Sequence, residues 1–112
     1  MTKRSSPVVL PGAPTGLVAV AVGGGQVILA WTECGAGGLG FRIERADGNS
    51  PSSPYVEIGG VGPHVTAFND EFVKLGMTYS YKVHARNASG KSSTSNVVGV
   101  TMPRAEAELP DD

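Results

Sequence analysis

Residues 78–87 read Thr-Tyr-Ser-Tyr-Lys-Val-His-Ala-Arg-Asn, and this stretch gives the clearest indication of the fold class of the chain. Apolar side chains occupy every second position from Tyr79 to Ala85, while polar ones fill the positions between them. Successive side chains of a β-strand point to opposite faces of its sheet, so the alternation predicts a strand with one buried face. The residues predicted to point outward are Ser80, Lys82, His84 and Arg86.

Six further strands are predicted around this one, bounded mostly by Gly, Pro, Asn, Asp or Ser. They occupy residues 16–22, 26–32, 41–46, 55–61, 66–70 and 92–102. The composition agrees, because the 112 residues include 16 Gly and 8 Pro for turns, and β-branched Val outnumbers Leu. We therefore expect a single all-β domain, a seven-stranded antiparallel Greek-key β-sandwich of the immunoglobulin-like kind.

A sandwich of this size must hold together without an intrachain disulfide, because Cys34 is the only cysteine. A domain of about 100 residues can bury enough apolar surface to do so. The large apolar residues at inward positions of the longer strands are expected to form that core. The predicted core residues are Leu29, Trp31, Phe41, Ile43, Tyr79, Tyr81 and Val83.

Several motifs of this chain resemble those of fibronectin type III domains. Residues 11–17, Pro-Gly-Ala-Pro-Thr-Gly-Leu, resemble the opening of such a domain. Residues 27–31, Val-Ile-Leu-Ala-Trp, resemble its second strand, and residues 41–45, Phe-Arg-Ile-Glu-Arg, resemble its third. Residues 68–70, Phe-Asn-Asp, and the stretch 81–92 resemble the segments around its sixth strand. The resemblance covers most of the chain and implies the fibronectin type III fold.

Residues 73–79, Val-Lys-Leu-Gly-Met-Thr-Tyr, resemble the tyrosine corner of the same family. The resemblance implies that the hydroxyl group of Tyr79 bonds backbone near residues 73–76. The family usually has Leu and Pro where this chain has Val73 and Leu75, and both departures leave the expected fold intact. No Arg-Gly-Asp sequence is present, so the integrin contact of some family members is not expected here.

The two ends of the chain carry opposite charge. Residues 1–14 are predicted to form a basic, Pro-rich arm, residues 15–102 the sandwich, and residues 103–112 an acidic tail. We expect protein partners to be contacted through these ends or through sheet edges, whose backbone N–H and C=O groups are unpaired. The opposite charges could meet within one chain or between chains. The candidate contact residues are Lys3, Arg4, Val8, Val9, Leu10, Glu106, Glu108 and Leu109.

No motif of the chain predicts catalysis, a cofactor or a metal site. Residues 35–40 fit the pattern Gly-x-Gly-x-x-Gly, but they precede a predicted strand rather than the helix that a dinucleotide site needs. His64 and His84 each lack a second ligand at metal-site spacing. The net charge of −1 predicts no general affinity for nucleic acid or anionic membranes. The apolar run at residues 8–10 is shorter than the core of a secretory signal.

These observations favour a non-enzymatic structural or protein-interaction module. One sandwich with two arms is similar to accessory proteins of bacteriophage virions, such as capsid decoration or tail components, which implies a place in the virion. A second interpretation is a spacer or accessory module of a secreted bacterial carbohydrate-active or surface protein, which would be extracellular. A third is a cell-adhesion or receptor module of a eukaryotic protein. The sequence leaves all three open.

Overall fold

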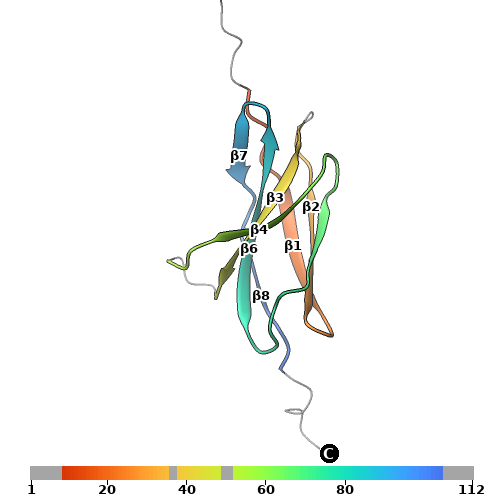
Figure 1. The fold of residues 1–112 in the computed structure, drawn as a ribbon, viewed down its shortest axis with the longest axis vertical. Helices are drawn as coiled ribbons and strands as arrows, with labels where there is room; N and C mark the ends of the chain where they lie inside the picture. The colour runs from red at the N-terminus through yellow and green to blue at the C-terminus, as the bar shows by residue number, and fades with distance from the viewer. Residues whose placement is uncertain (1–8, 36–37, 49–51, 105–112) are drawn as a thin grey trace, which may run out of the picture.

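The computed structural model describes residues 9–35, 38–48 and 52–104, which form eight β-strands and no helix (Figure 1). The described part of the chain therefore contains no helix able to span a membrane. The strands are β1 (Thr15–Val22), β2 (Gln26–Thr32), β3 (Gly40–Asp47), β4 (Val56–Val61), β5 (Ala67–Asp70), β6 (Thr78–Asn87), β7 (Gly90–Thr94) and β8 (Val98–Thr101).

The strands form two antiparallel sheets that pack face to face, as expected from the sequence. The smaller sheet has the order β1-β2-β5. The larger sheet has the order β4-β3-β6-β7, and β8 pairs with β6 beyond the end of β7. The prediction of an all-β, immunoglobulin-like antiparallel sandwich is confirmed. The segments that lead into β1 and out of β8 leave the sandwich at opposite ends (Figure 1).

The predicted last strand, residues 92–102, is wrong as one element, because it divides into β7 and β8. Ser95 and Asn96 lie between β7 and β8, and their side chains form hydrogen bonds with the backbone of other strands. The Ser95 hydroxyl accepts a hydrogen bond from Val83 N at 3.0 Å. Asn96 bonds both backbone groups of Leu17 in β1, accepting from its N–H at 2.9 Å and donating to its C=O at 3.0 Å. Between β7 and β8 the regular strand pairing with β6 is thus interrupted, and Asn96 instead links this sheet to β1 of the other sheet. This interruption explains why the structure has eight strands rather than seven.

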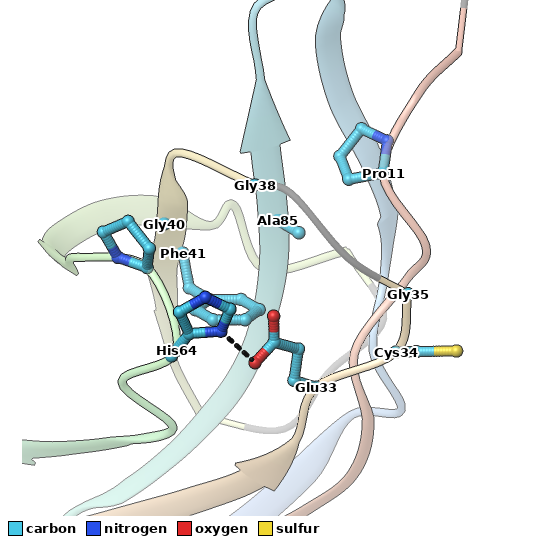
Figure 2. A pocket seen from close by; sticks show the side chains of 10 residues that line it. Pro11, Glu33, Cys34, Gly35, Gly38, Gly40, Phe41, His64 and Ala85 are labelled. Carbon is cyan, nitrogen blue, oxygen red and sulfur yellow. Dashed lines mark hydrogen bonds and ion pairs between the residues drawn. The ribbon is translucent and has the colours of Figure 1, made fainter.

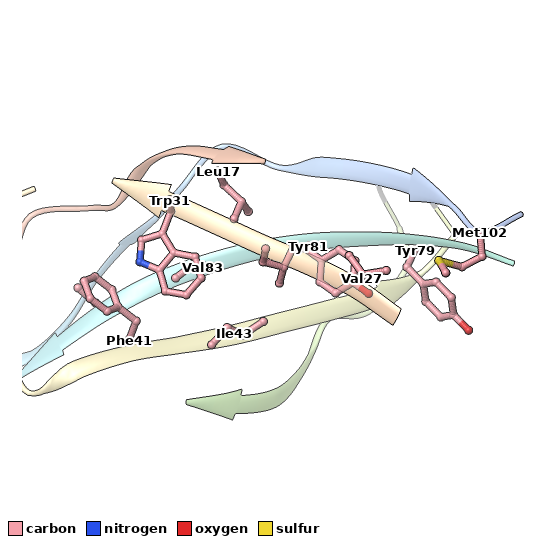
Figure 3. Close-up of a cluster of buried hydrophobic side chains, with 11 residues drawn as sticks. Leu17, Val27, Trp31, Phe41, Ile43, Tyr79, Tyr81, Val83 and Met102 are labelled. Atoms are coloured by element: carbon pink, nitrogen blue, oxygen red, sulfur yellow. The ribbon is translucent and has the colours of Figure 1, made fainter. Parts of the chain in front are cut away.

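All seven predicted core residues are buried between the sheets (Figure 3). Trp31 of β2 and Phe41 of β3 meet edge to face, with ring centroids 5.5 Å apart and an interplanar angle of 66°. This geometry is favoured by the charge distribution of aromatic rings. Leu17, Val27, Ala85 and Met102 complete the cluster. The core therefore rests on contacts between strands that are distant in the sequence.

The tyrosine corner is formed as the family resemblance implied. Lys74 N donates a hydrogen bond to the Tyr79 hydroxyl oxygen at 2.9 Å. This bond fixes the connection between β5 and β6 against the start of β6. Val73 packs against the core, so its replacement of the usual Leu does not prevent the motif from forming.

The outward side of β6 is less exposed than its alternation suggested. Arg86 is exposed and Lys82 half-buried, but Ser80 and His84 are only 3% and 4% exposed. The Ser80 hydroxyl donates to Gly48 O at 2.7 Å, because the turn after β3 folds over it. His84 is covered beside Glu44 of β3, with Nδ1 and Oε2 2.8 Å apart. Neighbouring segments, which the alternation of one strand does not reveal, cover these two positions.

Replacing Trp31 with Ala is expected to lower the free energy of unfolding by about 3–5 kcal/mol, because the buried indole fills one end of the core and its loss leaves a cavity there. Urea melts of the two proteins measure this directly. Phe72→Ala is the matched aromatic control, since Phe72 is 85% exposed and its removal should change stability by less than about 0.5 kcal/mol. Equal effects of the two substitutions would contradict the assigned core.

Candidate protein-interaction surfaces

The titratable side chains of the described residues are spread over separate strands and loops. No group of three or more His, Cys, Asp or Glu residues within residues 9–35, 38–48 and 52–104 could hold a metal ion. His64 Nδ1 lies 3.1 Å from Glu33 Oε1 at the surface, and His84 pairs with Glu44. Each imidazole therefore has a single carboxylate neighbour, and the two pairs lie on different strands and loops.

The glycine-rich loop before β3 borders a small pocket at one end of the sandwich (Figure 2). Its volume is about 10 Å³, which holds no more than about one water molecule. Gly40 must be a glycine here, because a Cβ at this position would collide with the carbonyl oxygen of Val61. Cys34 is exposed, and its sulfur points away from the pocket (Figure 2). The described residues at the end of the loop thus lead directly into β3.

A buried carboxylate joins the two sheets. Asp70 of β5 is 2% exposed and accepts hydrogen bonds from Arg45 Nη1 at 2.9 Å and the Tyr81 hydroxyl at 2.7 Å. Phe72 N donates to its second oxygen at 3.1 Å. Burial and the bond to Asp70 raise the pKa of Tyr81. Both oxygens of the buried carboxylate therefore have hydrogen-bond partners, as is usual for buried polar groups that hold a fold together.

Two of the predicted partner contacts, Val9 and Leu10, lie in the described residues. Asn87 Nδ2 donates to Val9 O at 2.8 Å, and Leu10 lies over Gly90, where a Cβ would come within 3.1 Å of its Cδ2. Both side chains remain exposed. Val9 and Leu10 are thus held against the turn between β6 and β7, with their apolar side chains open to solvent. The other predicted contacts, Lys3, Arg4, Val8, Glu106, Glu108 and Leu109, lie outside the described residues.

The structure adds an apolar surface that the sequence reading did not single out. The outer side of the smaller sheet carries Val18, Val20, Val22 and Ile28, which we call the valine face. Val18 and Val20 are 52% and 57% exposed, and Val20 lies directly opposite Ile28. No charged residue occurs in β1 or β2. The absence of charged residues from β1 and β2 was the sequence signal for an apolar surface. Which side of β1 faces the core became known only from the structure, where Leu17 is buried and Val18 is exposed.

No family model and no curated protein matches the chain. Solved structures do. An Fn3-like protein from Clostridium thermocellum is 26% identical with a TM-score of 0.69, over 88% of this chain and 99% of that one. A crystal structure of titin domains is 20% identical with a TM-score of 0.72, over 85% of this chain. The FN1–FN3 domains of chicken CNTN1 are 15% identical with a TM-score of 0.71, over 84%.

The chain spans about one third of the titin and CNTN1 structures, and nearly all of the Clostridium protein. These similarities, together with the strand order and the tyrosine corner, show that the chain folds as a fibronectin type III module. Modules of this fold commonly serve as structural or protein-interaction units, and the described surfaces agree with that class.

The network around Asp70 should make stability fall in alkali. Tyrosine in an unfolded chain ionises near pH 10, whereas the raised pKa of Tyr81 keeps the phenol protonated in the folded state. The unfolded state then releases a proton that the folded state retains, so the free energy of unfolding is expected to decrease as the pH rises above about 10. Urea melts between about pH 9 and pH 11 measure the slope.

Tyr81→Phe is the control for this dependence, because it keeps the ring and removes the ionisable group. The variant should be less stable at neutral pH, since Asp70 loses a donor, and its stability should fall less steeply in alkali. A slope equal to that of the unchanged protein would show that Tyr81 does not cause the dependence.

Proposed function

We propose that the chain is a non-enzymatic structural module that binds another protein through the valine face. The observation that carries this proposal is an uncharged surface of β-branched side chains that remains exposed to solvent after the two sheets have packed against each other. Two strands about 4.8 Å apart, over five residues of about 3.3 Å each, give the face an area of roughly 150 Å². The face is therefore a compact apolar patch, smaller than the roughly 300–600 Å² of the largest patch on a typical monomer.

The size of the face also indicates how the module would be used. A stable one-to-one interface buries about 800 Å² on each partner, so the valine face needs help from a second contact or from many copies bound together. The exposed Val9 and Leu10 offer such a contact at one end of the sandwich. The module therefore suits a repetitive assembly better than a single soluble receptor.

We propose a bacteriophage virion as that assembly, with the chain as an accessory component of its capsid or tail. A small module with an apolar docking face and a segment leaving at each end (Figure 1) fits a protein held in many copies on a larger particle. The alternative is a spacer or accessory module of a secreted bacterial carbohydrate-active or surface protein. Two observations favour it. One is the similarity to the Clostridium Fn3-like protein. The other is that the described segments before β1 and after β8 leave the sandwich at opposite ends (Figure 1), which allows insertion between neighbouring domains.

Sedimentation of native source material, followed by detection of this chain, separates the two contexts. Migration with a particle supports the virion, and the chain should then resist removal by mild washing. Recovery from the extracellular fraction within a longer polypeptide supports the spacer. Free migration as a slow monomer would contradict both.

Val20→Lys should abolish binding to the partner while leaving the fold unchanged. The substitution places a charge at the centre of the valine face, where a partner surface would have to desolvate it. Val56→Lys is the matched control, since Val56 is similarly exposed, at 61%, but lies on β4 of the other sheet. Co-sedimentation with the isolated particle or partner measures binding, and urea melts check folding. Unchanged binding by Val20→Lys would eliminate the valine face as the docking surface.

A further inference from the structure

Positive charge gathers at one end of the outer side of the larger sheet, around a shallow groove of about 330 Å³. Arg42 of β3 lies opposite His84 of β6, and Arg86 follows two positions further along β6 on the same side. Two guanidinium groups therefore border one hollow. The groove is lined by Leu39, Gly40, Arg42, Gly60, Val61 and Arg86.

The neighbouring strand adds to this positive charge. Lys91 of β7 lies directly opposite Arg86, and like charges in a cross-strand pair destabilise a sheet. Both side chains are exposed, and neither forms an ion pair with any residue that the structure describes. Arg42 is matched by Glu57, with Nη1 and Oε2 2.9 Å apart. The surplus charge thus sits at Arg86 and Lys91, where an anionic partner would relieve the repulsion.

The groove has a low floor and an apolar side chain at its rim. Its floor is low at Gly60, where a Cβ would approach Arg42 Cδ to 2.8 Å. Leu39 is exposed at its rim and offers an apolar contact beside the cations. The chemistry of the groove therefore fits an acidic peptide that also carries an apolar side chain.

This chain contains such a segment in residues 105–112, Ala-Glu-Ala-Glu-Leu-Pro-Asp-Asp, with four acidic residues and one Leu. We propose that residues 105–112 of one copy bind the Arg42–Arg86 groove of a second copy, so that molecules join head to tail. Such a contact joins two different surfaces of the same protein. Repeated from copy to copy, it produces a ring if the rotation closes and an open chain if it does not. The inference does not depend on which larger assembly the chain serves.

The distances along the strands favour a second copy over the chain's own groove. Thr101 pairs with Thr78, and Arg86 lies eight positions further along β6, which is about 26 Å. The chain then moves away from Arg86, because Pro103 O accepts from Gly76 N. Glu106 and Glu108 lie three and five residues after Pro103, so they reach at most about 10 and 17 Å from it. Neither can return to Arg86 of its own molecule. Asp111 and Asp112 lie eight and nine residues after Pro103 and could approach Arg86 only if the chain ran fully extended back along the sandwich, at about 27 and 31 Å.

Full-length variants separate the two halves of the contact. A tail-neutral chain carries Glu106→Gln, Glu108→Gln, Asp111→Asn and Asp112→Asn, and keeps the groove. A groove-neutral chain carries Arg86→Gln and Lys91→Gln, and keeps the tail. Sedimentation velocity at low ionic strength should show self-association of the unchanged chain and its loss at high salt. Each variant alone should be monomeric, and an equimolar mixture should form a dimer, because one supplies the groove and the other the tail.

Single substitutions give a matched comparison. Arg86→Gln is expected to weaken self-association about tenfold. Lys74→Gln removes the same charge from an exposed side chain in the turn after β5 and should leave self-association unchanged. Circular dichroism melts confirm that each variant is folded. A monomeric unchanged chain at low salt, self-association of either neutral variant alone, or a mixture that remains monomeric would each overturn the proposal.

Discussion

Burial of the inner sides of two sheets against each other is the constraint on which the rest of this structure depends. Side chains alternate along every strand, so placing Trp31, Tyr81 and Val83 in the core also decides which residues face outward. A slip of one residue in any strand would exchange its two sides and expose its core residues. The valine face and the cationic groove are both consequences of this packing, because each consists of the positions left over when the core is filled.

Hydrogen bonds between the two sheets specify their alignment, which burial of apolar side chains alone does not determine. Asp70 joins the short strand β5 to two strands of the opposite sheet through Arg45 and Tyr81. Asn96 holds β1 by both backbone groups of Leu17, and this closes part of an edge that would otherwise present unpaired groups. Hydrogen bonds have preferred distances and angles, so these contacts specify how the sheets are aligned, which the non-directional burial of side chains does not.

The outer sides of the two sheets differ in chemistry and so suit different partners. The outer side of the smaller sheet, along β1 and β2, offers β-branched side chains without charge. Burying such a surface away from water stabilises a complex. The larger sheet offers Arg86 and Lys91 side by side, a surface that attracts anions and responds to salt. A module with two such surfaces can hold a partner through one and a second copy of itself through the other.

Six of the seven predicted strands and the seven core residues could be read from the sequence alone, because alternation and turn residues act over a few neighbouring positions. The tyrosine corner followed from the resemblance of residues 73–79 to fibronectin type III domains. The sequence also showed the opposite charges of the two ends. Only the tertiary structure decided that residues 92–102 form two strands, that His84 is covered, and that Val20 faces solvent. The position of Lys91 directly opposite Arg86 was equally hidden. Each of these depends on which strands become neighbours and in what register, and that is set by the packing of distant segments rather than by the residues adjacent in the chain.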